Sequence, residues 1–94
     1  MKELEELTVR YEHDGVVLVE ELGKRIIRGG NWATVIFLFH ELDKKHGGFR
    51  KPKVALRRYQ KRRSGYELTA KFVLTSLEQA AEVAAVLDEW ADGP

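Results

Sequence analysis

The chain has 94 residues, of which 16 are basic and 15 acidic, a formal net charge of +1 and no cysteine. A chain of this length forms one small domain, so we expect residues 1–94 to share a single modest core. The lack of cysteine excludes a disulfide framework and a thiolate metal site, and it is compatible with an intracellular protein.

The first predicted element is a β-hairpin. Residues 7–13 alternate apolar and polar side chains, and the pair Asp14-Gly15 separates them from the apolar residues 16–19. An Asp-Gly pair between two such runs favours a type I′ turn, because glycine accepts a positive φ without steric cost. Gly23 interrupts the second arm and predicts a bulge or a tight turn there.

A central strand is predicted next. Residues 32–39 are β-branched and aromatic and are apolar on both faces, which is typical of a strand covered on both sides. We expect the C-terminal helix to cover one side and a partner subunit the other. Residues 43–52 form the only long polar connection, and their paired glycines indicate a mobile hairpin loop.

Two more strands are predicted at residues 53–63 and 66–74, with a turn between them. The two-residue period of a strand places Val54 and Leu56 on one face and a row of mostly basic side chains on the other. Alternate residues from Tyr66 to Leu74 form an apolar face, which we expect on the same side of the sheet as Val54 and Leu56.

The chain ends in a predicted helix. Ser76 is the preferred N-cap, because Ser76 and Gln79 have the spacing of a capping box, and Gly93 ends the helix. Apolar residues recur at helical spacing from Leu77 to Ala91 and form a stripe that can lie across the sheet. The predicted fold class is α+β: an antiparallel β-sheet meander of about five or six strands, followed by one C-terminal helix packed on the sheet.

Charge is distributed unevenly along the chain. Residues 1–21 carry a net charge of −5, residues 22–75 carry +11, and residues 76–94 carry −5. Ten of the 16 basic residues lie between Lys44 and Arg63, with no acidic residue among them. Such a cluster is typical of a protein that binds a phosphate-bearing partner. The alternative is that these residues only keep a sheet edge and its loop in solution.

The basic strand face predicts the site. Its cations recur at intervals of about 7 Å, which is close to the phosphate spacing of an extended single strand. Tyr59 lies among them, where its ring could stack on a base or pack across the strands. A duplex reader would more often insert a basic helix, and the predicted helix is acidic. The candidate nucleic-acid-binding residues are Lys44, Lys45, Arg50, Lys51, Lys53, Arg57, Tyr59, Lys61, Arg63 and Lys71.

Other site chemistry is missing from the sequence. His13, His40 and His46 have no metal-ligand spacing, and no Ser-His-Asp arrangement or cluster of carboxylates stands out. We therefore expect no catalytic residues, no metal, no cofactor and no small-molecule substrate. The longest uncharged stretch, residues 29–40, is too short to span a bilayer, and the start of the chain is acidic, so we expect a cytoplasmic protein without a membrane partner.

The order of elements resembles the positive-coactivator and Whirly group of single-stranded DNA-binding proteins. Residues 71–79, Lys-Phe-Val-Leu-Thr-Ser-Leu-Glu-Gln, look like that group's last strand running into its helix. Members form dimers through helices and strands and bind single-stranded DNA on strands that lie away from the helices. The resemblance implies that Lys53, Arg57, Tyr59, Lys61 and Lys71 lie on the binding sheet, and that Val83, Leu87 and Trp90 lie near a dimer interface.

Our leading hypothesis is a non-enzymatic, homodimeric module that binds single-stranded DNA or RNA, as an accessory protein of transcription or replication. An alternative is a protein-interaction module whose basic patch docks an acidic protein partner. A third hypothesis is a small enzyme subunit or regulator completed by another chain.

Overall fold

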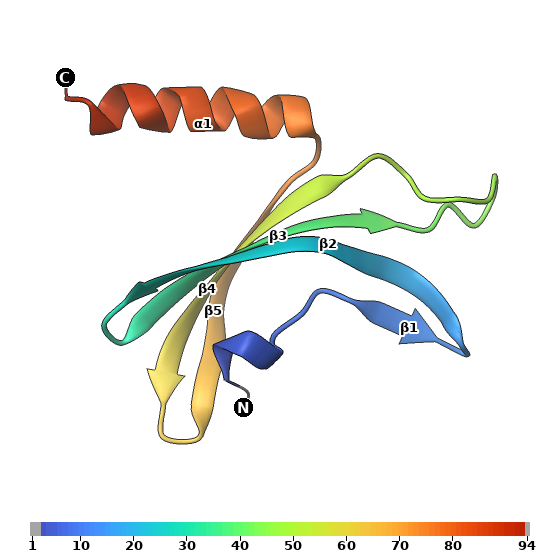
Figure 1. Ribbon diagram of the computed structural model, residues 1–94, viewed down its shortest axis with the longest axis horizontal. Helices are drawn as coiled ribbons and strands as arrows, with labels where there is room; N and C mark the ends of the chain where they lie inside the picture. Colours follow the sequence, from blue (N-terminus) through green and yellow to red (C-terminus); the bar gives the residue numbers. More distant parts are fainter. Residues whose placement is uncertain (1–2, 94) are drawn as a thin grey trace.

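The fold is a curled antiparallel sheet with a helix on one side, seen in a computed structural model that describes residues 3–93 (Figure 1). Its elements are η1 (Leu4–Glu6), β1 (Tyr11–His13), β2 (Val16–Gly29), β3 (Trp32–Glu41), β4 (Lys53–Arg62), β5 (Gly65–Leu74) and α1 (Leu77–Ala91). The five strands form one sheet in the order β1-β2-β3-β4-β5, so each strand pairs with the next one along the chain. The predicted α+β class, with its meander and its C-terminal helix, is confirmed.

Local signals in the sequence set several of these bounds. Asp14 and Gly15 have φ values of 51° and 79°, and two positive values are what a type I′ turn requires. The pairing of β2 with β3 shifts between Glu21 and Gly23, which is the predicted bulge. Ser76 is the N-cap of α1, since its Oγ accepts a hydrogen bond of 3.0 Å from the backbone N–H of Gln79.

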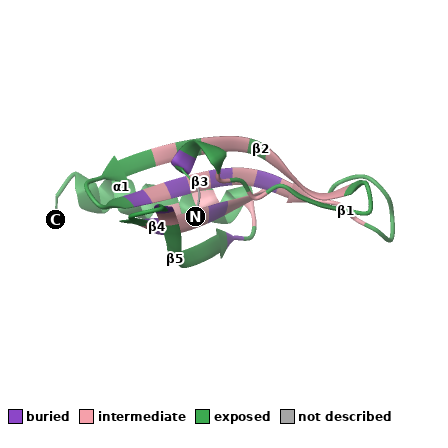
Figure 2. Ribbon diagram, turned by 90° about the horizontal axis from the view of Figure 1, so that it is seen from below, coloured by how far each residue is buried: buried purple, intermediate pink, exposed green. Residues whose placement is uncertain are grey.

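The two faces of the sheet differ in their cover. On β3, Ala33, Val35, Phe37 and Phe39 are buried, and we call their side the core face. The alternate side chains of β3, from Trp32 to His40, belong to the opposite side of the sheet. Figure 1 shows α1 on that side, which we call the helix face. Figure 2 shows the buried positions following β3. Of the buried apolar side chains in residues 3–93, only Leu74 lies on the helix face.

Residues 3–10, the N-terminal segment, cover the core face. Leu4 is 0% exposed and belongs to the same cluster as Val35 and Phe37. Leu7 and Val9 pack against the edge of this cluster. We had expected the helix and a partner subunit to cover β3, whereas the chain's own start covers one of its two sides.

Lys24 of β2 fixes the N-terminal segment to the sheet. Its Nζ donates hydrogen bonds to the carbonyl oxygens of Leu4, Glu5 and Leu7, at 2.7, 3.1 and 2.7 Å. The carbonyl of Leu4 also accepts the backbone N–H of Leu7 at 3.3 Å, so the ammonium group adds to that bond and supplies a donor to the carbonyls of Glu5 and Leu7.

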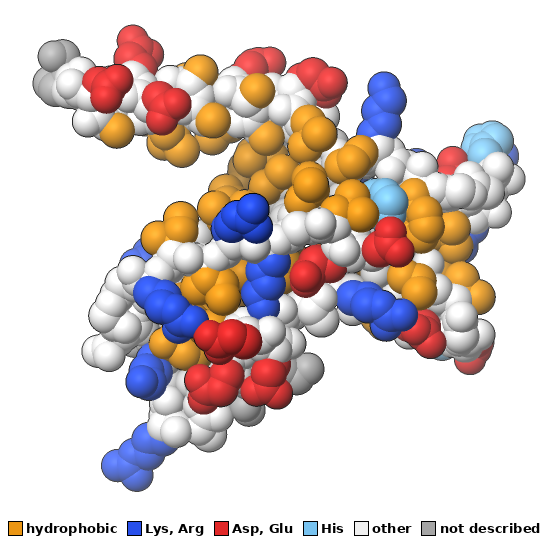
Figure 3. All heavy atoms as spheres, in the orientation of Figure 1, with side chains coloured by type: hydrophobic (Ala, Val, Ile, Leu, Met, Phe, Trp, Pro, Cys, Tyr) orange, Lys and Arg blue, Asp and Glu red, His pale blue; other side chains and the backbone are white. Residues whose placement is uncertain are grey.

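The helix follows β5 as predicted and contacts β4 and β5. None of its residues is buried, and Leu87 and Trp90 are 56% and 70% exposed. Figure 3 shows hydrophobic side chains along the side of α1 that faces the sheet, and more of them on the sheet near the start of the helix. The apolar stripe predicted for α1 is present, but it remains uncovered.

A β-bulge divides β5 between the two faces. Arg58 pairs with Ala70 and Tyr59 pairs with Leu68, so Thr69 is an extra residue whose Oγ1 donates to the carbonyl of Arg58 at 3.1 Å. An extra residue reverses the side to which the following side chains point.

The bulge corrects the single apolar face that we predicted for this strand. Phe72 and Leu74 stand opposite Leu56 and Val54 on the helix face, as expected. Tyr66 and Leu68 lie instead on the core face, opposite Lys61 and Tyr59, so one apolar face from Tyr66 to Leu74 is wrong.

Candidate nucleic-acid interface

The core face carries the predicted row of cations along β4 and β5. Lys53 and Arg57 stand opposite Phe39 and Val35 of β3, which places both on the core face. Lys61 lies two pairs beyond Tyr59 on the same strand, and Lys71 of β5 stands directly opposite Arg57. The alternation predicted for residues 53–61 is confirmed.

The pair Arg57 and Lys71 has an electrostatic cost. Like charges directly opposite each other in an antiparallel pair have Cβ atoms about 5 Å apart and repel. The guanidinium of Arg57 lies 5.7 Å from the centroid of the Phe37 ring, so the core holds this charge in place. Within residues 3–93 neither side chain forms an ion pair with a carboxylate. An anion placed between them would relieve the repulsion.

Tyr59 is not available to a base. It is 4% exposed and lies in the core cluster, so the packing interpretation of this residue describes the structure. Tyr66 has the more accessible ring, since it is half-buried, stands opposite Lys61 and packs only against the edge of the core. Tyr66 was not among the residues predicted from the sequence, because no glycine or proline stands at the extra residue, Thr69, to indicate a bulge.

The remaining predicted residues lie at the two ends of the sheet. Lys44, Lys45, Arg50 and Lys51 are in the connection between β3 and β4, and Arg63 is in the turn between β4 and β5. Figure 1 shows these two connections at opposite ends of the sheet. The ten predicted residues therefore form a row on the core face with a basic group beyond each end, and not one compact patch.

The loop between β3 and β4 is held by Asp43 and His40. The carboxylate of Asp43 accepts hydrogen bonds from the backbone N–H groups of Lys45 and His46, at 3.0 and 3.1 Å. These bonds, chiefly the one from His46, lower the pKa of Asp43 from its ordinary value. The ring of His40 stacks on Phe49, with centroids 4.0 Å apart.

Ion pairing leaves most of the predicted cations without a carboxylate. Lys53 Nζ lies 2.7 Å from Glu41 Oε1, and Arg50 lies 3.9 Å from Asp43. Among the residues that the structure describes, the other predicted cations have no such partner: Lys44, Lys45, Lys51, Arg57, Lys61, Arg63 and Lys71. Cations without a carboxylate partner can bind the phosphates of a nucleic acid.

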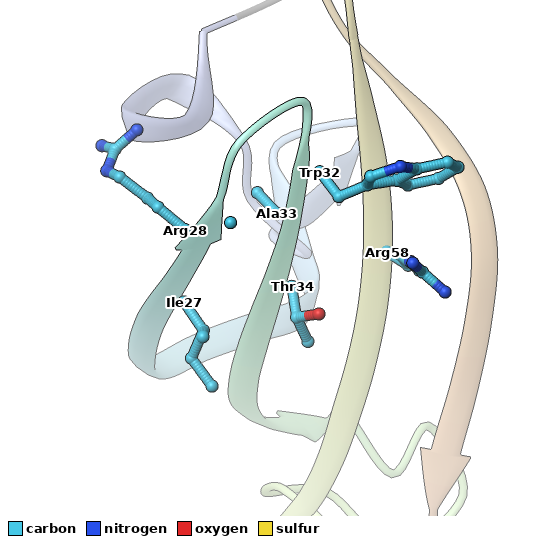
Figure 4. Close-up of a pocket in the computed structure, with 7 residues that line it drawn as sticks. Ile27, Arg28, Trp32, Ala33, Thr34 and Arg58 are labelled. Atoms are coloured by element: carbon cyan, nitrogen blue, oxygen red, sulfur yellow. The ribbon is translucent and has the colours of Figure 1, made fainter.

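A hollow on the helix face lies beside Trp32. Its lining includes Ile27, Thr34 and Arg58, and Figure 4 shows the Trp32 ring beside the Arg58 guanidinium. Arg58 lies 4.3 Å from the ring centroid. Trp32 thus packs on a side chain of its own sheet.

Residues 3–93 contain no group of three or more His, Cys, Asp or Glu side chains that could hold a metal ion. Over the same residues, α1 is neither long nor apolar enough to cross a membrane.

Comparison with family models, with curated proteins and with solved structures gave no match. The resemblance to the positive-coactivator and Whirly group therefore stays a prediction, and the case for a function rests on the geometry of the sheet.

Proposed function

We propose that this protein is a non-enzymatic, cytoplasmic module that binds single-stranded nucleic acid along β4 and β5 on the core face. The observation that carries the proposal is the cross-strand pair of Arg57 and Lys71. Two cations held opposite each other without a carboxylate destabilise the sheet by themselves, and a phosphate between them offsets that cost. Lys61 continues the row at strand spacing.

Tyr66 is the aromatic residue that we assign to base stacking. Its ring lies opposite Lys61 on the core face and is only half-buried. A stacked base contributes about 1 to 3 kcal/mol and discriminates little between sequences. Affinity then comes mostly from phosphate contacts, so binding should depend steeply on salt and weakly on sequence. This mode suits an accessory protein of transcription or replication.

A second copy of the chain is the partner that we propose for the helix face. The stripe of α1 and Phe72, which is 61% exposed, are uncovered apolar groups in one small domain. Charges favour a copy of the same chain, because residues 76–94 carry five acidic and no basic residues, whereas Arg25 and Arg58 are exposed on the helix face. Sedimentation should show a dimer at micromolar concentration, and Leu87→Ser with Trp90→Ser should yield a monomer.

The test of binding is fluorescence anisotropy of a labelled oligo-deoxythymidine. The variant Lys61→Gln/Lys71→Gln should bind at least about tenfold more weakly at about 50 mM salt, and its salt slope should fall by about 1.4, or about 0.7 for each lost phosphate contact. The matched control, Arg25→Gln/Arg58→Gln, removes the same charge from the helix face. Because these arginines are also assigned to the contact between copies, both variants are made in the monomeric Leu87→Ser/Trp90→Ser background, where the control should bind as that background does. Equal weakening in both variants would contradict a site on the core face.

The same titration separates the two candidate partners. If the wild type does not bind single-stranded DNA or RNA even at low salt, the cation row is free for an acidic protein, which is the alternative function. Capture of a protein partner that survives nuclease treatment would then replace nucleic acid in the proposal.

A further inference from the structure

The N-terminal segment lies on the same face of the sheet as the cation row. Leu4 shares its cluster with Ala55 and Tyr59 of β4, the residues that alternate with the cations there. The segment is held mainly from the β2 side, where Lys24 binds its carbonyl groups. The core face thus has a covered half at β2 and β3 and an open half at β5, where residues 67–73 are exposed.

The groups that attach the N-terminal segment to the sheet are not the groups that carry its charge. Leu4 and the backbone carbonyls anchor it, whereas Glu3, Glu5 and Glu6 are exposed. Their carboxylates are not needed for the apolar anchor. The segment nonetheless brings negative charge to the one face of the sheet on which a phosphate chain would be bound.

One of these carboxylates already forms an ion pair with a cation of the core face. Glu5 forms an ion pair with Arg28 of β2, and the side chains of both are more than half exposed. Arg28 stands opposite Ala33 and so belongs to the core face. The backbone N–H of Glu5 and the Arg28 guanidinium lower the pKa of this carboxyl from its ordinary value. Glu5 is therefore ionised at neutral pH and keeps Arg28 engaged.

We propose that the N-terminal segment is a built-in competitor of nucleic acid, with Glu5 taking the place of a phosphate on Arg28. This inference rests on the proposed function and concerns the regulation of the same site. While Glu5 holds Arg28, a bound strand draws its contacts from the row of Arg57, Lys61 and Lys71. When Glu5 is neutral or displaced, Arg28 adds one contact and the binding surface widens from β4 and β5 toward β2.

The experiment compares single neutralisations of equal charge. Glu5→Gln releases Arg28 and keeps both Leu4 and the carbonyls that bind Lys24. Glu82→Gln, on the exposed helix, changes the net charge equally but lies on the other side of the sheet. All proteins in this comparison carry Leu87→Ser/Trp90→Ser, so that the contact of the helix with a second copy does not enter it. With labelled oligo-deoxythymidine at about 50 mM salt, Glu5→Gln should bind about fivefold tighter, with a salt slope steeper by about 0.7, and Glu82→Gln should match the wild type.

Arg28→Gln gives a second, independent readout. In the wild-type background it should change the affinity by less than about twofold, because Glu5 already occupies the guanidinium. In the Glu5→Gln background it should remove the whole gain. The midpoint of urea unfolding, measured for each variant, establishes that the proteins compared are folded.

The outcomes separate this inference from the function on which it rests. A gain in Glu5→Gln that Arg28→Gln removes supports the competitor. Equal affinity of Glu5→Gln and wild type, an equal gain in Glu82→Gln, or a gain that survives Arg28→Gln overturns it and leaves the binding function standing. Failure of every protein to bind a single strand overturns the proposed function and, with it, the competitor.

Discussion

The two faces of the sheet differ in how far the rest of the chain covers them. The core face is closed by the chain's own first residues, so Phe37 is 0% exposed there. The helix face stays open although α1 lies on that side, and Phe72 is 61% exposed. The difference shows that the buried apolar cluster of residues 3–93 lies on the core face. The apolar surface of the helix face is left for contacts with other molecules.

The largest difference between the faces is expected in the free energy of unfolding when one phenylalanine on each face is truncated to alanine. Phe37→Ala should lower the free energy of unfolding by about 3 to 5 kcal/mol, because it leaves a cavity in the buried cluster of the core face. Phe72→Ala should cost less than about 1 kcal/mol at concentrations where the chain is monomeric. Urea unfolding followed by circular dichroism measures both, and similar losses would mean that the helix face is also a core.

A second prediction concerns the attachment of the N-terminal segment. Lys24→Met keeps most of the side chain's length but removes the three donors to the carbonyls of Leu4, Glu5 and Leu7. We expect a loss of about 1 to 3 kcal/mol in the free energy of unfolding, since hydrogen bonds from a charged group are lost.

The neighbouring residue provides the control for that change. Arg25 is exposed on the helix face, and Arg25→Met should alter stability by less than about 0.5 kcal/mol. Amide hydrogen exchange should also rise in residues 3–10 of Lys24→Met and stay unchanged in Arg25→Met. Unchanged exchange in both proteins would show that the hydrogen bonds of Lys24 are not needed to anchor the segment.

The smallest expected effect lies in the loop between β3 and β4, away from both faces. The pKa of Asp43 is lowered in the folded protein, chiefly by the backbone N–H of His46. Its contribution to stability is therefore present above the ordinary aspartate pKa and is lost as the pH falls through the folded-state pKa. Asp43→Asn should weaken the dependence of stability on pH in this acidic range, and a carboxyl NMR titration of Asp43 should show the lowered pKa directly. A titration at or above the ordinary value would contradict the bonds to Lys45 and His46.

Features that depend only on residues close together in the chain could be predicted from the sequence. The pair Asp14-Gly15 specifies its turn, Gly23 marks its bulge and Ser76 caps the helix, because each acts within a few residues of itself. The alternation of cations along β4 follows in the same way from the period of a strand.

Features that depend on distant partners could not be predicted. The cover of the core face joins Leu4 to residues more than thirty positions later in the chain, such as Phe37, and one buried leucine among glutamates gives no periodic signal. No glycine indicates the bulge at Thr69, so Tyr66 was predicted on the helix face, whereas it lies on the core face. For the same reason the choice between packing and stacking for Tyr59 had to wait for the structure.

The strand order has a consequence for how the chain is made. Each strand pairs with the one synthesised just before it, so the sheet can grow outward from local hairpins, and contacts of this kind favour rapid folding. Leu4 is the exception, because its cluster includes residues from Ala33 to Tyr59. The N-terminal segment can therefore complete its packing only after β3 and β4 have formed, and until then the core face of β2 and β3 stays uncovered.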